Sequence, residues 1–202
     1  MPRKRLTREE SRDQTRERLL DAAAVTIAKK GLAASSVEDI AAHAGYTRGA
    51  FYSNFDSKTD LFIELLKRDH EDIQQGLQQI LDAGLSKEDM QKQLALFYVQ
   101  VYCGDTSFVL WAEARLQALR DAKFRARLSA LLLEKREVIA YFITQFCAVM
   151  KTTPPAPADD LAFGMMALID GVRFFNACMP KELPDANAEA VLGSIFRATF
   201  FD

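Results

Sequence analysis

The stretch from Ser35 to Lys58, SSVEDIAAHAGYTRGAFYSNFDSK, contains the signals for two short helices joined by a tight turn. Apolar residues in its first half lie at i, i+3, i+4 and i+7, the spacing of one helix face: Val37, Ile40, Ala41 and Ala44. Gly45 follows the last of them, at the position where helices commonly end in a left-handed residue. The pattern therefore predicts a short helix that ends at Gly45.

Hydroxyl side chains mark the starts of the helices in this stretch. Ser35 or Ser36 can cap the first helix, and Ser35 with Glu38 fits a capping box. Thr47 can cap the second helix, and Ser57 can cap a further helix that follows it. We therefore expect two capped helices and the beginning of a third element within these residues.

The second helix of the stretch has two sides of different character. Phe51 and Phe55, at i and i+4, face inward. The outward positions hold small or hydrogen-bonding residues: Arg48, Gly49, Ala50, Ser53 and Asn54. A helix with this surface, joined to its predecessor by a tight turn, has the geometry of a helix that enters a DNA groove.

An earlier helix supports the pair. Residues 20–27 repeat the same apolar spacing, and Gly31 ends the segment. Three helices in about forty-five residues form a head that is close to the lower size limit for a stable core. We therefore expect the head to lean on the fourth helix, which begins near Lys58.

These segments resemble the TetR family of bacterial transcriptional regulators, in particular its AcrR-like members. The matching stretches are LLDAAAVTIAKKG, SVEDIAAHAGYTRGAFYSNF and the DSKTDLF that follows, all within residues 16–65. The helix faces, both glycines, the Phe51–Tyr52 pair and the Ser57–Lys58 pair occur together in register. Tyr46, Ser53 and Asn54 depart from the residues that are usual in the family.

The resemblance implies which residues of the head contact DNA. Phosphate contacts are expected from Thr47, Tyr52 and Lys58. The groove-facing residues are the five outward ones, Arg48, Gly49, Ala50, Ser53 and Asn54. Arg48 is the best candidate for reading a base, because the arginine fork matches guanine at two points. The alternative is that Arg48 binds only phosphate.

Charge is distributed unevenly along the chain. The whole sequence has 26 Lys/Arg and 28 Asp/Glu; the first 58 residues hold eleven and eight of these, which leaves fifteen and twenty for the rest. A basic head on an acidic body suits a DNA-binding protein, because attraction to phosphate is local. Arg3, Lys4 and Arg5 have no acidic residue beside them, so we expect an arm that contacts DNA phosphates or the minor groove. The alternative is that the basic N-terminal residues form a solvated tail or the charged first turns of the first helix.

The 202 residues predict an all-α protein with two domains. The expected divisions are a basic flexible arm at 1–14, a three-helix helix-turn-helix head at 15–60, and a C-terminal helical bundle for ligand binding and dimerisation at 61–202. A long helix is expected from 58 to 83, and further helices near 86–103, 107–120, 122–150, 158–179 and 187–201.

Aromatic and polar residues of the body form a candidate ligand pocket. In the resembled family such a cavity lies among the central helices of the body, and its lining would be mostly apolar with a few polar groups. The candidates are Phe97, Tyr98, Tyr102, Trp111, Arg115, Phe142 and Phe146, with Glu113 nearby. They indicate an apolar or aromatic effector. The alternative is that these side chains are ordinary bundle core.

The last two helices are apolar on most of their circumference, so both sides need cover. Asp170 and Arg173 near the middle of the first of them argue against a membrane span. The resemblance implies a dimer that packs these helices as a four-helix bundle, although purely intrachain packing is the alternative. The expected interface residues are Gly164, Ala167, Leu168, Gly171, Phe175, Leu192, Ile195, Phe196 and Thr199.

The sequence thus predicts a homodimeric regulator that binds a palindromic operator in double-stranded DNA and is released by a small molecule. The resemblance implies a repressor, because repression is the usual mode in the family. The rival is a helical small-molecule-binding or scaffold protein that does not touch DNA. Catalytic motifs and paired metal-ligand cysteines are missing from the sequence, so we expect no enzyme activity, metal or cofactor. The polar N-terminus predicts no signal peptide and a bacterial cytoplasmic protein, associated with the nucleoid when bound to DNA.

Overall fold

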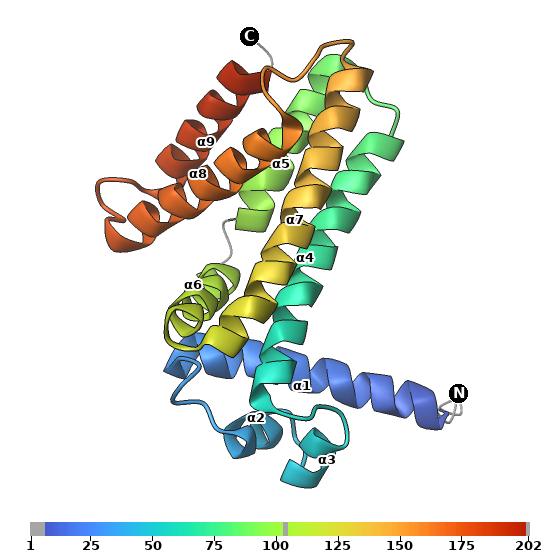
Figure 1. Ribbon diagram of the computed structural model, residues 1–202, viewed down its shortest axis with the longest axis vertical. Helices are drawn as coiled ribbons and strands as arrows, with labels where there is room; N and C mark the ends of the chain where they lie inside the picture. Colours follow the sequence, from blue (N-terminus) through green and yellow to red (C-terminus); the bar gives the residue numbers. More distant parts are fainter. Residues whose placement is uncertain (1–6, 103–104, 201–202) are drawn as a thin grey trace. The chain divides into compact units, whose positions relative to one another are not determined.

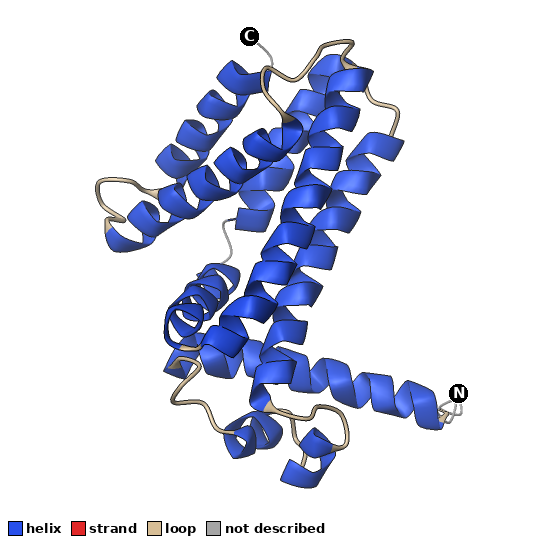
Figure 2. Cartoon of the chain, viewed as in Figure 1, coloured by secondary structure: helices blue, strands red, loops and turns tan. Residues whose placement is uncertain are grey.

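The computed structural model describes the backbone of residues 7–102 and 105–200, and within these residues every regular element is a helix (Figures 1 and 2). The side chains of residues 95, 98–102, 105 and 196–200 lie outside the description. The helices are α1 (Arg8–Lys30), α2 (Val37–His43), α3 (Arg48–Tyr52), α4 (Lys58–Asp82), α5 (Lys87–Tyr102), α6 (Asp105–Arg120), α7 (Ala122–Val149), α8 (Ala158–Cys178) and α9 (Asp185–Phe200). The all-α fold class is confirmed.

The chain forms two compact units whose limits differ from the sequence prediction. The first unit comprises Met1–Asp69 and Val109–Leu128, and the second comprises His70–Phe108 and Ser129–Asp202. The head was expected to end at residue 60, but its unit includes the first half of α4, most of α6 and the start of α7. The first half of α4 follows the head directly, but residues 109–128 are far from it along the chain, so no local pattern indicated that they belong to this unit.

The core of the first unit combines α1, α2 and α3 with the helices that follow. The side chains of Leu19, Ala23, Ile27, Ile40, Phe51 and Leu61 are all fully or almost fully buried. Phe62 on α4 stacks on Phe124 of α7, with 5.9 Å between the ring centroids. The small head thus gains its core from α4, as predicted, and also from α7.

Helix α1 begins earlier than expected. Thr7 and Glu10 form a capping box in which each side chain accepts the backbone N–H of the other residue. Residues 8–14, which were assigned to the flexible arm, are therefore helical. Arg3, Lys4 and Arg5 lie outside the described residues.

Three apolar clusters lie among the described residues of the second unit, and each is shared by two or three of the helices α4, α5, α7, α8 and α9, which Figure 1 labels. The first joins α4, α5 and α7 through residues that include Ile73, Met90 and Phe142. The second joins α7 to α8 around Ile139 and Ala162, and the third joins α8 to α9 around residues 169, 172, 188 and 192. Successive helix pairs therefore share one continuous series of apolar contacts.

Helix α8 is the one described helix that is long and apolar enough to cross a membrane by length and composition. It also contains Asp170 and Arg173, and its inner side packs on α7 and α9. Such a helix is common in the bodies of water-soluble proteins, so this composition is weak support for a membrane span.

Candidate nucleic-acid interface

The turn between α2 and α3 is fixed by its backbone. Gly45 has φ of 77°, in the left-handed region that favours glycine, as the sequence predicted. The N–H of Tyr46 then donates to the carbonyl of Ala41 at 2.8 Å, which closes the turn. Thr47 caps α3 by accepting the N–H of Ala50 at 3.3 Å. These local bonds set the direction in which α3 leaves α2.

The cap of α2 differs from the expected one. Ser36 and Asp39 form the capping box, with Asp39 N–H donating to Ser36 Oγ at 3.0 Å. Ser35, which was predicted to pair with Glu38, is buried and donates instead to the carbonyl of Gly31 at 2.8 Å. Glu38 is consequently free of the cap and lies exposed on the surface.

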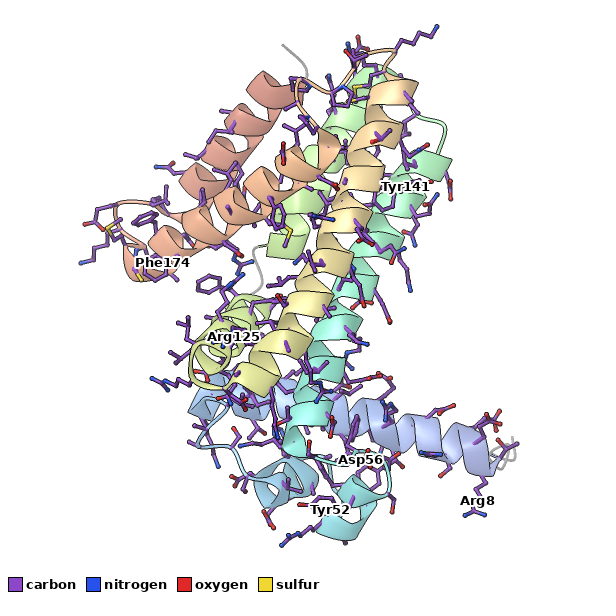
Figure 3. The ribbon with its side chains drawn as sticks, in the orientation of Figure 1. Arg8, Tyr52, Asp56, Arg125, Tyr141 and Phe174 are labelled. Atoms are coloured by element: carbon purple, nitrogen blue, oxygen red, sulfur yellow. The ribbon has the colours of Figure 1, made fainter. Side chains whose placement is uncertain are left out.

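The outward side of α3 is exposed, as the sequence predicted. Thr47, Arg48, Gly49, Tyr52 and Ser53 are all exposed, and Ala50 is half-buried. Tyr52 at the end of α3 keeps 47% of its surface accessible (Figure 3). Phe51 on the opposite side is fully buried and fixes the helix to the core. This arrangement offers a small, rigid helix surface to a partner.

Arg48 lies between two side chains of the head. Its Nη1 is 2.9 Å from Oε1 of Glu38 on α2, and its guanidinium lies 5.4 Å from the centre of the Tyr52 ring. Both partners of the ion pair are more than half exposed. The candidate base reader therefore has a defined position, which the sequence did not predict.

Asn54 is turned away from the exposed surface. Its Nδ2 donates to the carbonyl of Ala50 at 2.8 Å, and its Oδ1 is buried. Its backbone carbonyl accepts Nη1 of Arg16 at 2.8 Å. These bonds hold the end of α3, so the geometry gives no support to the expectation that Asn54 contacts bases.

Lys58 is also directed inward. Its Nζ donates to the carbonyls of Leu32 and Ser35, each at 2.6 Å, and desolvation by burial lowers the pKa of this amine. Two short bonds to backbone carbonyls hold the loop between α1 and α2. In this structure the amine is thus engaged with the protein, and its expected contact with phosphate would require these bonds to be shared or exchanged.

The sequence did not predict two further sets of polar interactions in the head, one made by Glu113 and one made by Arg16. Oε2 of Glu113 on α6 accepts the N–H of Leu32 at 2.9 Å, and its carboxylate lies against Gly31, whose φ is 82°. Arg16 on α1 forms an ion pair with Glu64 at 3.0 Å and lies over the ring of Phe55. Glu113 is 81 residues from its partner, so no local pattern could have indicated the pair.

The predicted pocket residues do not form one group. Phe97, Phe142 and Phe146 belong to the apolar cluster of α4, α5 and α7, where the Phe97 ring lies directly against Gly76. Trp111 and Arg115 belong to the first unit, and Nε1 of Trp111 donates to Asp69 at 2.7 Å. The side chains of Tyr98 and Tyr102 lie outside the described residues. The core alternative thus describes the three phenylalanines.

The predicted dimer residues divide between exposed and buried positions. Gly164, Ala167, Phe175 and Ile195 are exposed, and a Cβ added at Gly164 or Gly171 would meet only open space. Leu192 is buried in the cluster shared by α8 and α9, so its role is intrachain. Leu168 is half-buried beside the same cluster, and the side chains of Phe196 and Thr199 lie outside the described residues.

Comparison with known proteins agrees with this geometry. Residues 19–65 match the family model described as bacterial regulatory proteins, tetR family. Residues 19–65 are therefore similar to the DNA-binding region of the TetR family. The matched residues contain α2, the turn and α3 in full, together with the start of α4.

Relatives extend the likeness beyond the head. The chain is 30% identical over 124 residues to the HTH-type transcriptional repressor KstR2 of Rhodococcus jostii. The match covers 61% of this chain and 60% of KstR2, so the chain spans less than two thirds of that relative. A solved structure from Rhodococcus sp., assigned to the same family, has a TM-score of 0.78 at 22% identity and covers 93% of this chain and 99% of that one. A transcriptional regulator from Saccharomonospora viridis, solved in complex with choline, has a TM-score of 0.71 at 19% identity over 92% of this chain and 96% of that one.

Proposed function

We propose that this protein is a homodimeric transcriptional repressor that binds a palindromic operator and is released by a small molecule. The observation that carries the proposal is the exposed face of α3, with Arg48, Gly49 and Tyr52, held rigidly by the Gly45 turn and the buried Phe51. The likeness to the repressor KstR2 supports the regulatory role. A bacterial cytoplasmic location follows from that role.

DNA recognition would place α3 in the major groove. Arg48 would read a guanine edge, Gly49 would allow the backbone to come close, and Ala50 would contact a thymine methyl group. Thr47 and Tyr52 would bind the flanking phosphates, and Arg3, Lys4 and Arg5 would add charge to the neighbouring backbone. Two heads related by a twofold axis would read half-sites about 34–36 Å apart.

Dimerisation would use the exposed side of α8 and α9. Phe174 and Phe175 keep 55% and 51% of their surfaces accessible, and Ile195 keeps 40% (Figure 3). Gly164, Ala167 and Gly171 are small residues that allow close helix approach. Exposed aromatic rings beside small residues are typical of a face that a second subunit covers.

The effector is proposed to act through α6. This helix begins in the second unit and continues into the first, where Glu113 holds the N–H of Leu32 directly before α2. A small molecule that binds among the body helices could favour another position of α6. That movement would disturb the loop that contains Leu32, and it would also disturb the cap of α2 at Ser36. Such a ligand shifts DNA affinity only by its differential affinity for the two positions.

Two variants at Glu113 test this coupling without knowledge of the effector. Glu113→Ala removes the acceptor of the Leu32 N–H, so we expect faster hydrogen exchange at Leu32 and about tenfold weaker DNA binding, the cost of one hydrogen bond to a charged group. Glu113→Gln keeps an acceptor oxygen and should stay near wild type. Unchanged exchange and affinity in Glu113→Ala would exclude Glu113 from the coupling.

The rival function is a helical small-molecule-binding or scaffold protein that does not bind DNA. A mobility-shift assay with the DNA that flanks its own gene separates the two functions. The repressor predicts a specific complex at an upstream palindrome that weakens steeply with salt. The rival predicts no specific complex on any flanking fragment.

A further inference from the structure

The ion pair between Glu38 and Arg48 has a consequence for how the head distinguishes sequences. The carboxylate comes from α2 and the guanidinium from α3, so the pair joins the two helices of the motif across their exposed side. The pair is possible because the cap of α2 is made by Ser36 and Asp39, which leaves Glu38 outside the capping box.

The geometry of the pair leaves part of the arginine available. The ion pair is made by Nη1, while the ring of Tyr52 lies 5.4 Å from the guanidinium carbon. A guanidinium carries five N–H donors, and a contact with guanine needs two of them. Arg48 can therefore keep Glu38 on one side and present the remaining donors to a base edge.

The carboxylate also changes the charge that the head presents to DNA. A free arginine is attracted to any phosphate, whereas an arginine paired with a carboxylate is locally neutral. Glu38 itself is 58% exposed in its side chain and would repel a phosphate that came close. Both effects weaken binding to the backbone, which is the same for every sequence, more than binding to a guanine edge.

We propose that Glu38 is a positioning residue for sequence readout. It orients Arg48 toward a base edge and suppresses the contact of Arg48 with phosphates at other sequences. This inference rests on the proposed function, because it requires that α3 binds DNA. It goes beyond that function by assigning specificity to a residue of α2 that lies ten positions before the arginine.

The test uses two duplexes and four forms of the full-length protein. One duplex is selected from a random library by the wild-type protein, and the other is the same duplex with its half-sites scrambled. Affinities are measured by fluorescence anisotropy at several salt concentrations for wild type, Glu38→Gln, Arg48→Ala and the double variant. Glu71→Gln removes a carboxylate from an exposed position of the second unit and serves as the control for net charge.

Glu38→Gln should tighten binding to the scrambled duplex and lower the ratio of selected to scrambled affinity about three- to tenfold. It should also steepen the logarithmic salt slope on the scrambled duplex by about 0.9 per head, or about 1.8 per dimer. Glu71→Gln should leave the ratio unchanged. In the Arg48→Ala background, Glu38→Gln should lower the ratio much less than it does in wild type, because Glu38 acts mainly through Arg48 and only its direct repulsion of phosphate remains. Partial unfolding lowers the active fraction for both duplexes alike, so it does not change the ratio.

Two results would overturn the inference. One is an unchanged ratio in Glu38→Gln, which would leave Glu38 without influence on readout. The other is an equal fall of the ratio with and without Arg48, which would mean that Glu38 acts independently of it. The proposed function fails separately, if the wild-type protein enriches no sequence from the library.

Discussion

The head and the α8–α9 pair place their phenylalanine side chains in opposite ways. In the head, Phe51 and Phe55 are buried, and the residues left outside on α3 are small, polar or basic, apart from the ring of Tyr52. On α8, Phe174 and Phe175 are more than half exposed, although the same helix buries Ala162 and Ile169. The first surface suits the phosphates and base edges of DNA, and the second needs apolar cover.

The two regions are also held together differently. Polar ties fix the head, with Lys58 and Glu113 on the loop after α1 and Arg16 on the end of α3. Apolar contacts dominate between α8 and α9, and Nδ2 of Asn176 on α8 donates to the carbonyl of Leu183 and to Oδ1 of Asp185 on α9, each at 2.9 Å. The positions of the helices in the small head therefore depend on hydrogen bonds and ion pairs, because the apolar core of the head alone is small.

The largest effect is expected from the buried ring of the head. Phe51→Ala should destabilise the first unit by about 3–5 kcal/mol, because loss of the buried ring leaves a cavity that the surrounding side chains fill only in part. Hydrogen exchange should show lost protection in α1–α3 and retained protection in α5 and in the part of α7 that follows Leu128, both of which belong to the second unit. Tyr141→Ala, at a ring that is 51% exposed, should cost less than about 1 kcal/mol. Equal losses in both variants would contradict the division into units.

A charged side chain placed among the small residues of α8 tests whether the exposed apolar surface of α8 and α9 forms the dimer interface. Ala167→Arg places a cation on the exposed side of α8 and should convert the dimer to a monomer in light scattering. Because two linked heads bind far more tightly than one, operator affinity should fall at least about 100-fold. Ala148→Arg, at an exposed position of α7, is the matched control. A dimer that persists in Ala167→Arg would place the interface elsewhere.

Variants of Lys58 and Arg48 distinguish a residue that stabilises the head from a residue that contacts DNA. Lys58→Ala leaves two carbonyls unsatisfied and should destabilise the head by about 1–3 kcal/mol in chemical denaturation. Arg48→Ala should leave stability unchanged, cost about 1–3 kcal/mol in binding to the selected duplex and relax sequence preference.

If Lys58 serves only as a phosphate contact, its variant has wild-type stability and a salt slope reduced by about 0.9 per head, or about 1.8 per dimer. Equal losses of affinity on all sequences in Arg48→Ala would show that this residue does not read bases.

The smallest effect concerns the cap of α2. The hydrogen bond from Lys30, followed by the bonds within the Ser36 cap, lowers the pKa of Asp39 from 3.8 to about 2. Because the pKa is lower in the folded state, the carboxylate stabilises the head above about pH 4, and this contribution is lost as the pH falls toward about 2.

The melting temperature of Asp39→Asn should therefore be below that of wild type at neutral pH, and the difference should shrink between pH 4 and 2. A difference that stayed constant over this range would mean that Asp39 acts without its charge.

Sequence reasoning succeeded where the cause of the structure is local. Gly45, Thr47 and Phe51 were predicted because turns, caps and helix faces depend on residues three to five positions apart. Lys58 and Glu113 bond to partners between 23 and 81 residues away, so their inward direction had no local signal.

The body shows the same division. Its helix boundaries were predicted to within about two residues, because they depend on local breakers and caps. Which aromatic rings share a cluster depends on how the helices pack, and for this reason Trp111 could not be separated from Phe97 and Phe142 by sequence.

Selection of duplexes from a random library by the wild-type protein tests the central claim most directly. The account predicts enrichment of a palindromic site with half-sites about 10–10.5 base pairs apart, bound by a dimer with an affinity that falls steeply as salt is raised. Enrichment of no sequence, or binding that salt leaves unchanged, would contradict a twofold DNA reader built on α3.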